Sequence, residues 1–106
     1  MDINSYSYTG NDFANDYNTT IANYENDDMY CIIYRAARGN IGNWINGYTV
    51  TAASYDGTMD ICEFYETLQA AQQLYDAIII NFAHCPPTKR ETRALINAAK
   101  KADKKH

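Results

Sequence analysis

The sequence predicts an α+β fold with an N-terminal helix, a three-stranded antiparallel sheet, a long packing helix and a C-terminal surface helix. Apolar residues alternate in short runs over residues 29–66, and after Tyr65 their period changes from two to about 3.6. A chain of 106 residues has room for one domain with a modest core. We therefore expect a single domain at 1–106, divided into a polar lead and helix at 1–28, a meander at 29–66, a core helix at 67–85 and a basic helix at 88–105.

The first strand is expected at Tyr30–Ala37, where aromatic and β-branched residues are frequent. Glycine and asparagine recur over residues 38–43, and both residue types tolerate left-handed backbone angles. This favours a chain reversal there. Asn46-Gly47 is an alternative tight turn, which would end an earlier segment at Ile45.

The second and third strands are expected at Tyr48–Ser54 and Thr58–Tyr65. The first of these runs alternates apolar residues with threonine, as a half-buried strand does. Asp56-Gly57 between them is typical of a hairpin turn, because both residues suit positive φ angles. An exposed edge of the first or the third strand offers pairing between two copies, so a homodimer is one possible assembly.

The core helix has a wide apolar stripe. Thr67 is its expected N-cap, and Cys85-Pro86-Pro87 ends it, because proline has no amide donor. We expect this helix to cover one face of the sheet. The stripe consists of Leu68, Ala71, Leu74, Tyr75, Ala77, Ile78, Ile79 and Phe82.

The two terminal helices have different signals. Beyond Asn11, Phe13, Tyr17, Ile21 and Tyr24 are spaced three or four residues apart, which favours an amphipathic helix closed by the acidic turn 25–28. Near the other end, Thr88 and Glu91 fit a capping box. The helix after it has a thin apolar stripe, so it should lie on the surface. Tyr34, Tyr48 and Tyr75 are the tyrosines expected to be buried.

The three cysteines give little support for chemistry. Cys31, Cys62 and Cys85 form no C-x-x-C pair, so the sequence predicts no metal site, no disulfide framework and no cofactor. Cys31 and Cys62 fall in predicted strands, where a thiol packs as a small apolar group. A nucleophile and base at Cys85 and His84 is the enzymatic alternative, but no third orienting residue is evident. We expect no catalytic residue.

The termini and apolar runs favour a cytoplasmic protein. The first residues include Asp2 and no basic residue before Arg35, unlike a secretory signal, and no window holds eighteen consecutive apolar residues. No association with a membrane is expected.

Charge is divided unevenly along the chain. Residues 1–88 contain eleven acidic and two basic residues, a net charge of −9, whereas residues 89–106 contain seven basic and two acidic residues, a net charge of +5; together they give −4. An acidic body disfavours direct binding to a phosphate backbone and suits a basic protein surface. Tyrosine is enriched at such interfaces. Acidic and tyrosine residues cluster at Tyr24, Glu25, Asp27, Asp28, Tyr55, Asp56, Asp60, Glu63 and Glu66, which are the candidate partner-binding residues.

Nucleic-acid binding is the alternative function. A strand-rich domain can read DNA through its sheet, and the basic C-terminal helix adds cations. The same cations also suit the negative end of a helix dipole or offset the acidic body. The candidate residues for this alternative are Arg35, Arg38, Trp44, Lys100, Lys101, Lys104 and Lys105.

In composition the chain resembles the small acidic proteins that phages use against host defences, including anti-CRISPR and anti-restriction inhibitors. The features involved are the Asn-, Asp- and Tyr-rich sequence, the acidic segments Glu25–Asp28 and Asp56–Glu66, and the strand-and-helix unit from Tyr30 to Phe82. The resemblance implies a non-enzymatic inhibitor in the host cytoplasm that binds a host defence or nucleic-acid-processing complex.

Overall fold

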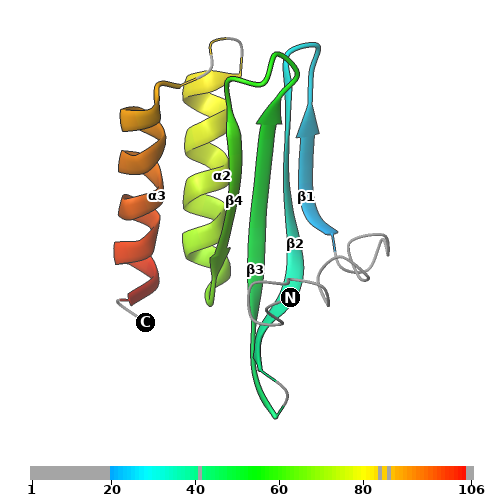
Figure 1. Ribbon diagram of the computed structural model, residues 1–106, viewed down its shortest axis with the longest axis vertical. Helices are drawn as coiled ribbons and strands as arrows, with labels where there is room; N and C mark the ends of the chain where they lie inside the picture. The colour runs from blue at the N-terminus through cyan, green and yellow to red at the C-terminus, as the bar shows by residue number, and fades with distance from the viewer. Residues whose placement is uncertain (1–19, 41, 84, 86, 105–106) are drawn as a thin grey trace.

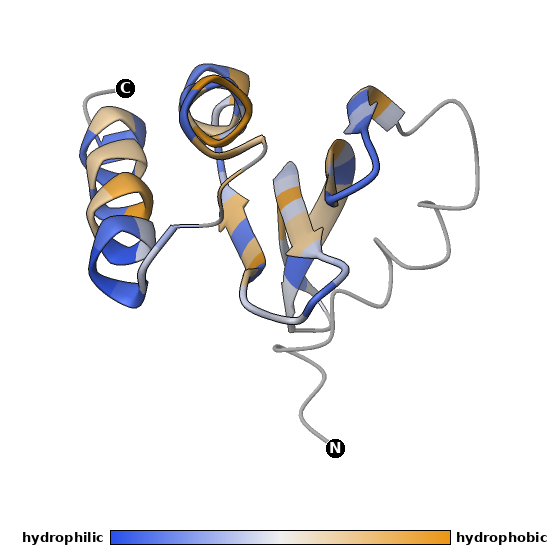
Figure 2. Cartoon of the chain, turned by 90° about the horizontal axis from the view of Figure 1, so that it is seen from above, coloured by the Kyte–Doolittle hydropathy of each residue, from blue (hydrophilic) through white to orange (hydrophobic). Residues whose placement is uncertain are grey.

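A computed structural model describes residues 20–40, 42–83, 85 and 87–104. Within these residues four strands form one antiparallel sheet in the order β1-β2-β3-β4, and two helices lie on the same side of it (Figures 1 and 2). The expected α+β class is confirmed, with four strands in place of three. The elements are β1 (Thr20–Glu25), β2 (Met29–Asn40), β3 (Asn43–Ser54), β4 (Asp60–Tyr65), α2 (Leu68–Phe82) and α3 (Lys89–Lys104).

Strand β1 replaces the C-terminal part of the expected N-terminal helix, and residues 11–19 of that helix lie outside the described residues. The helical spacing of Ile21 and Tyr24 was misleading because a β-bulge interrupts the pairing of β1 with β2 between Thr20 and Ala22. Residues three apart fall on opposite faces of a regular strand, but a bulge changes this alternation. Both Ile21 and Tyr24 pack against the core.

The central hairpin extends beyond its neighbours. The β2–β3 pairing continues to Asn40 and Asn43, whereas β1 ends opposite Tyr34 and β4 ends opposite Tyr48, which leaves a two-stranded arm (Figure 1). The chain reverses between Asn40 and Asn43, inside the region 38–43 where a turn was expected, but residues 38–40 pair within β2 and do not form the turn. The alternative turn at Asn46-Gly47 is wrong, because both residues pair within β3.

The core lies between the sheet and α2. Tyr34 and Tyr75 are buried as expected, but Tyr48 is only partly buried and Tyr65, at 1% exposure, is the most buried tyrosine of the described residues. Leu68 is 38% exposed, contrary to expectation, because it occupies the first residue of α2. The core residues shared by sheet and helix include Cys31, Ile33, Val50, Ala52, Ile61, Tyr65, Ala70, Ala71, Leu74 and Ile78.

Both expected helix caps are present. The Thr67 hydroxyl accepts the Ala70 amide at 3.2 Å. At the start of α3, Thr88 Oγ1 accepts the Glu91 amide at 3.2 Å and Glu91 Oε1 accepts the Thr88 amide at 2.9 Å, which completes the capping box.

Helix α3 runs beside β4 on the surface and is held at its C-terminal end. Its Asp103 carboxylate accepts the amides of Glu66 at 3.0 Å and Thr67 at 2.9 Å, and the Thr67 hydroxyl donates to it at 2.8 Å. Ala99 is fully buried against the core. Neither of the two helices in the described part of the chain has the length and apolar character needed to span a membrane.

Candidate functional site

Two turns meet at one end of the sheet and bring together acidic and tyrosine residues from distant parts of the sequence. The β1–β2 turn and the β3–β4 turn lie at the same end because alternate strands run in the same direction (Figure 1). The Tyr55 amide donates to the Asp28 carbonyl at 2.9 Å, and the Tyr55 hydroxyl donates to Glu25 Oε2. We call this surface, formed by Glu25, Asp27, Asp28, Tyr55 and Asp56, the acidic tip.

Aromatic area is exposed in the acidic tip. Tyr55 is 55% exposed, and its ring centroid lies 6.2 Å from that of Tyr30 in a tilted arrangement. The hydrogen bond to Glu25 raises the pKa of the Tyr55 hydroxyl, with the nearby charge of that carboxylate adding to the effect. The Tyr55 ring is therefore held in a fixed position while much of its surface faces solvent.

Asp56 also organises its own turn. Its Oδ1 accepts the Ser54 hydroxyl at 2.7 Å, the Thr58 amide at 3.0 Å and the Thr58 hydroxyl at 2.7 Å. The Thr58 hydroxyl, followed by the Thr58 amide and the Ser54 hydroxyl, lowers the pKa of Asp56 to about 2. Asp56 thus stays negative throughout the neutral range, and the turn predicted at Asp56-Gly57 is confirmed, with Gly57 at φ 84°.

The structure divides the predicted partner-binding residues. Tyr24 is half-buried next to the tip, where its hydroxyl accepts Asn26 Nδ2 at 3.2 Å. Three carboxylates of the second predicted cluster lie outside the tip. Asp60 and Glu63 belong to β4, and Glu63 lies 3.7 Å from Lys100, while Glu66 follows the opposite end of β4.

The residues proposed for nucleic-acid binding are also separated. Arg35, Arg38 and Trp44 belong to the β2–β3 hairpin, but Arg38 pairs with Ile45 and Trp44 with Gly39, so the Arg38 and Trp44 side chains are on opposite faces. Arg38 lies over the Phe64 ring, 5.1 Å from its centroid. Lys100, Lys101 and Lys104 are on α3, and Lys105 lies outside the described residues.

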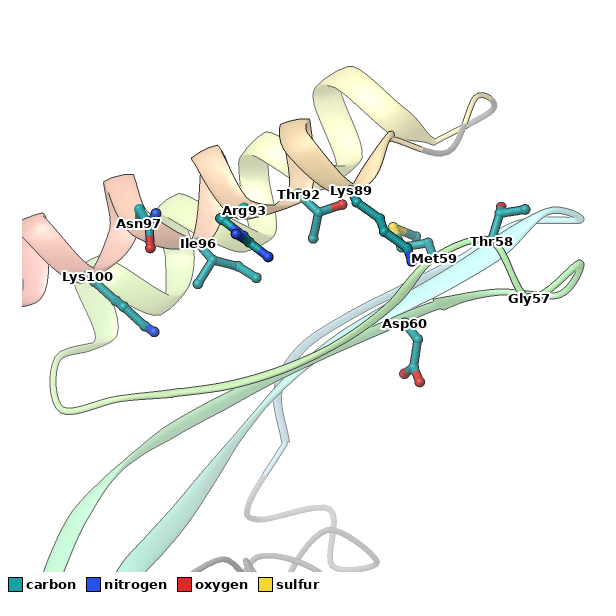
Figure 3. A pocket seen from close by; sticks show the side chains of 10 residues that line it. All are labelled: Gly57, Thr58, Met59, Asp60, Lys89, Thr92, Arg93, Ile96, Asn97 and Lys100. Carbon is teal, nitrogen blue, oxygen red and sulfur yellow. The ribbon is translucent and has the colours of Figure 1, made fainter.

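A second surface is a groove of about 530 Å³ between α3 and the start of β4. Figure 3 shows Lys89, Arg93 and Lys100 projecting from α3 toward β4, whereas the Asp60 side chain points away from the helix. Lys89 and Arg93 were not candidates from the sequence. The sequence did contain a signal for them. Lys89 and Arg93 are four residues apart, and Arg93 and Lys100 are seven apart, which places all three on one face of a helix. We call this surface the basic groove, and it is lined by Gly57, Thr58, Met59, Asp60, Lys89, Thr92, Arg93, Ile96, Asn97 and Lys100.

The cysteines have different environments. Cys31 is buried, and burial, with a smaller contribution from Asp76, raises the pKa of its thiol to about 12, so it packs as an apolar group. Cys62 is exposed, which corrects the expectation that it is buried; Cys85 is also exposed, and His84 lies outside the described residues. No group of three or more metal-binding side chains suited to an ion occurs within 20–40, 42–83, 85 and 87–104.

The comparisons with known proteins do not assign a family. No protein-family model matches the chain, and neither a curated protein nor a solved structure matches it. The acidic tip and the basic groove are the surfaces of the described residues that bear on function.

Proposed function

We propose that this protein is a non-enzymatic inhibitor that docks its acidic tip on a basic site of a nucleic-acid-handling protein, as an anti-defence protein would. The observation that supports this most is the convergence of two acidic, tyrosine-containing segments, 24–28 and 55–56, at one end of the sheet. Together they place four carboxylates around an exposed tyrosine.

The charge of the tip suggests the class of partner. A site that binds a phosphate backbone has several lysine or arginine side chains, and carboxylates form the same charge-assisted hydrogen bonds with them. A protein carrying fixed carboxylates therefore competes with nucleic acid for that site. The long-range field of the acidic body accelerates association with such a surface.

The tyrosines add contact area that charge alone does not provide. Tyr55 is already held by Glu25 and by the Asp28 carbonyl, so little side-chain entropy is lost when a partner covers it. Rigid aromatic residues near the centre of an interface commonly contribute most of its binding free energy. Tyr55 is the residue of the tip that we expect to contribute most.

The test is affinity purification from host lysate with the full chain and with two variants. The tip variant Asp27→Lys reverses one charge in the β1–β2 turn, and the matched control Asp76→Lys reverses one charge at an exposed position of α2. We expect the unmodified chain and the control to recover a nucleic-acid-handling protein that the tip variant loses. Binding to that protein should weaken as salt rises and should compete with DNA or RNA.

Two outcomes would contradict the proposal. Equal recovery by the tip variant would show that the interface lies elsewhere. Recovery of a partner whose binding is insensitive to salt and unaffected by nucleic acid would exclude competition for a phosphate-binding site.

A further inference from the structure

We propose that the groove between β4 and α3 binds an extended acidic peptide, which adds to the sheet as a fifth strand beside β4. This site is separate from the acidic tip and has the opposite charge. Three observations support it: an open strand edge, a basic wall beside it, and two cations of that wall whose spacing matches the repeat of a strand.

Strand β4 is an edge of the sheet, and its outward backbone groups can be identified. The Ser54 amide donates to the Met59 carbonyl at 3.0 Å, which makes these two residues a hydrogen-bonded pair next to the β3–β4 ladder. Such pairs alternate along an antiparallel ladder. The amides and carbonyls of Asp60, Cys62 and Phe64 therefore point away from β3.

At the C-terminal end of the same edge, an outward amide is bound by a carboxylate. The next outward amide in the series is that of Glu66, and it donates to Asp103 Oδ2 at 3.0 Å. A carboxylate oxygen from α3 thus already occupies one position of the edge. The stretch from Asp60 to Phe64 is the part that remains for another strand.

Helix α3 forms a basic wall along this stretch. Its start lies beside residues 57–60 across the groove, Lys100 lies beside Glu63, and Asp103 lies beside Glu66, so α3 and β4 run in the same direction (Figures 1 and 3). Lys89 and Arg93 form no ion pair with the described residues, and Met59 and Ile96 supply apolar surface between the two elements. The wall therefore favours an anionic partner.

The spacing of the first two cations fits a strand. Lys89 and Arg93 are separated by about 6 Å along the helix and Lys89 and Lys100 by about 16 Å, at 1.5 Å per residue. Side chains on one face of a strand recur about every 6.6 Å. Acidic residues at two successive alternate positions of a peptide would therefore face Lys89 and Arg93. Lys100, about 16 Å from Lys89, falls between the third such position at about 13 Å and the fourth at about 20 Å.

A second copy of the chain is a less suitable occupant. Antiparallel pairing of two β4 edges would bring both α3 helices to the same junction and place like charges near each other. The homodimer expected through Tyr30–Ala37 is not available in this fold, because those residues belong to β2, which is flanked by β1 and β3.

The test uses a fluorescent synthetic peptide in which glutamate alternates with valine, titrated into the full chain at low salt. We expect binding that is lost when alternate amides on the β4-facing edge are N-methylated and kept when the amides on the other edge are N-methylated. In amide exchange, the peptide should protect Asp60, Cys62 and Phe64. A peptide with lysine in place of glutamate should not bind.

A pair of matched variants tests whether the peptide binds in the groove. Arg93→Glu should weaken peptide binding roughly tenfold or more. Lys101→Glu makes the same reversal of charge at an exposed position of α3 outside the groove, and it should have a much smaller effect. Equal effects of both variants, or equal binding of both N-methylated peptides, would show non-specific attraction of anions and overturn strand addition. Failure of the peptide to bind to a chain that sediments as a dimer would assign the edge to a second copy and also overturn the proposal.

Discussion

The acidic tip and the basic groove share the β3–β4 turn but are built in different ways. The tip consists of two turns joined by Tyr55, and its acidic residues are close only because the sheet brings residues 25–28 next to residues 55–56. The groove depends on one helix held parallel to one strand. The tip is therefore fixed by pairing within the sheet, and the groove by the attachment of α3.

This difference has a functional consequence. A tip that projects its carboxylates suits the concave, basic surface of a folded partner, whereas a groove beside a strand edge suits a flexible peptide. The two surfaces would bind different partners and respond differently to mutation. Variants that loosen α3 should impair the groove and spare the tip.

The largest effect on stability is expected for Asp103→Ala. This change removes the acceptor of three hydrogen bonds from Glu66 and Thr67, and it should lower the free energy of unfolding by about 2 kcal/mol. Urea denaturation measures it. The variant should also lose affinity for the acidic peptide, because the basic wall is no longer held beside β4.

The matched control is Asp76→Ala on α2, where the carboxylate accepts a single bond from Gln72 at 2.9 Å. Its effect on the free energy of unfolding should be within about 0.5 kcal/mol. If both variants were equally stable, the attachment of α3 would have to come from its apolar contacts alone.

An intermediate effect on stability is expected for Asp56→Asn, and the size of this effect should depend on pH. The folded-state pKa of Asp56, about 2, is below its ordinary value of 3.8, so its carboxylate stabilises the fold above pH 3.8 and loses this contribution as pH falls toward 2. The melting temperature of the unmodified chain should exceed that of the variant at neutral pH, and the difference should disappear near pH 2. Asp27→Asn, in the neighbouring turn, is the control; a difference that did not change with pH would contradict this origin.

Local chemistry made several elements predictable from sequence. The Thr67 cap, the Thr88–Glu91 capping box and the Asp56-Gly57 turn all involve residues within four positions of each other, and all are present. Their physical causes do not depend on the rest of the fold. Strand β1 was missed because a bulge gave its apolar residues helical spacing.

The candidate site was predictable only in part. The sequence indicated that acidic residues and tyrosines cluster, but not that Glu25 and Tyr55 would join two clusters across thirty residues. It also could not assign Glu63 to the helix side of β4, because that depends on where α3 packs. Long-range placement of this kind is decided by packing of the core and not by local pattern.

The smallest effect is expected for Glu63→Gln, which removes the carboxylate that β4 places beside Lys100 of α3. Lys100 Nζ lies 3.7 Å from Glu63 Oε1, and their side chains are 53% and 28% exposed, so this pair should contribute less than about 1 kcal/mol to stability. Glu63→Gln should leave urea denaturation nearly unchanged. It should strengthen peptide binding roughly two- to fivefold at low salt, because Lys100 no longer has to leave a neighbouring carboxylate. Glu66→Gln removes the same charge beyond the end of β4 and should leave affinity almost unchanged; if it strengthened binding equally, the gain would come from total charge and not from the released lysine.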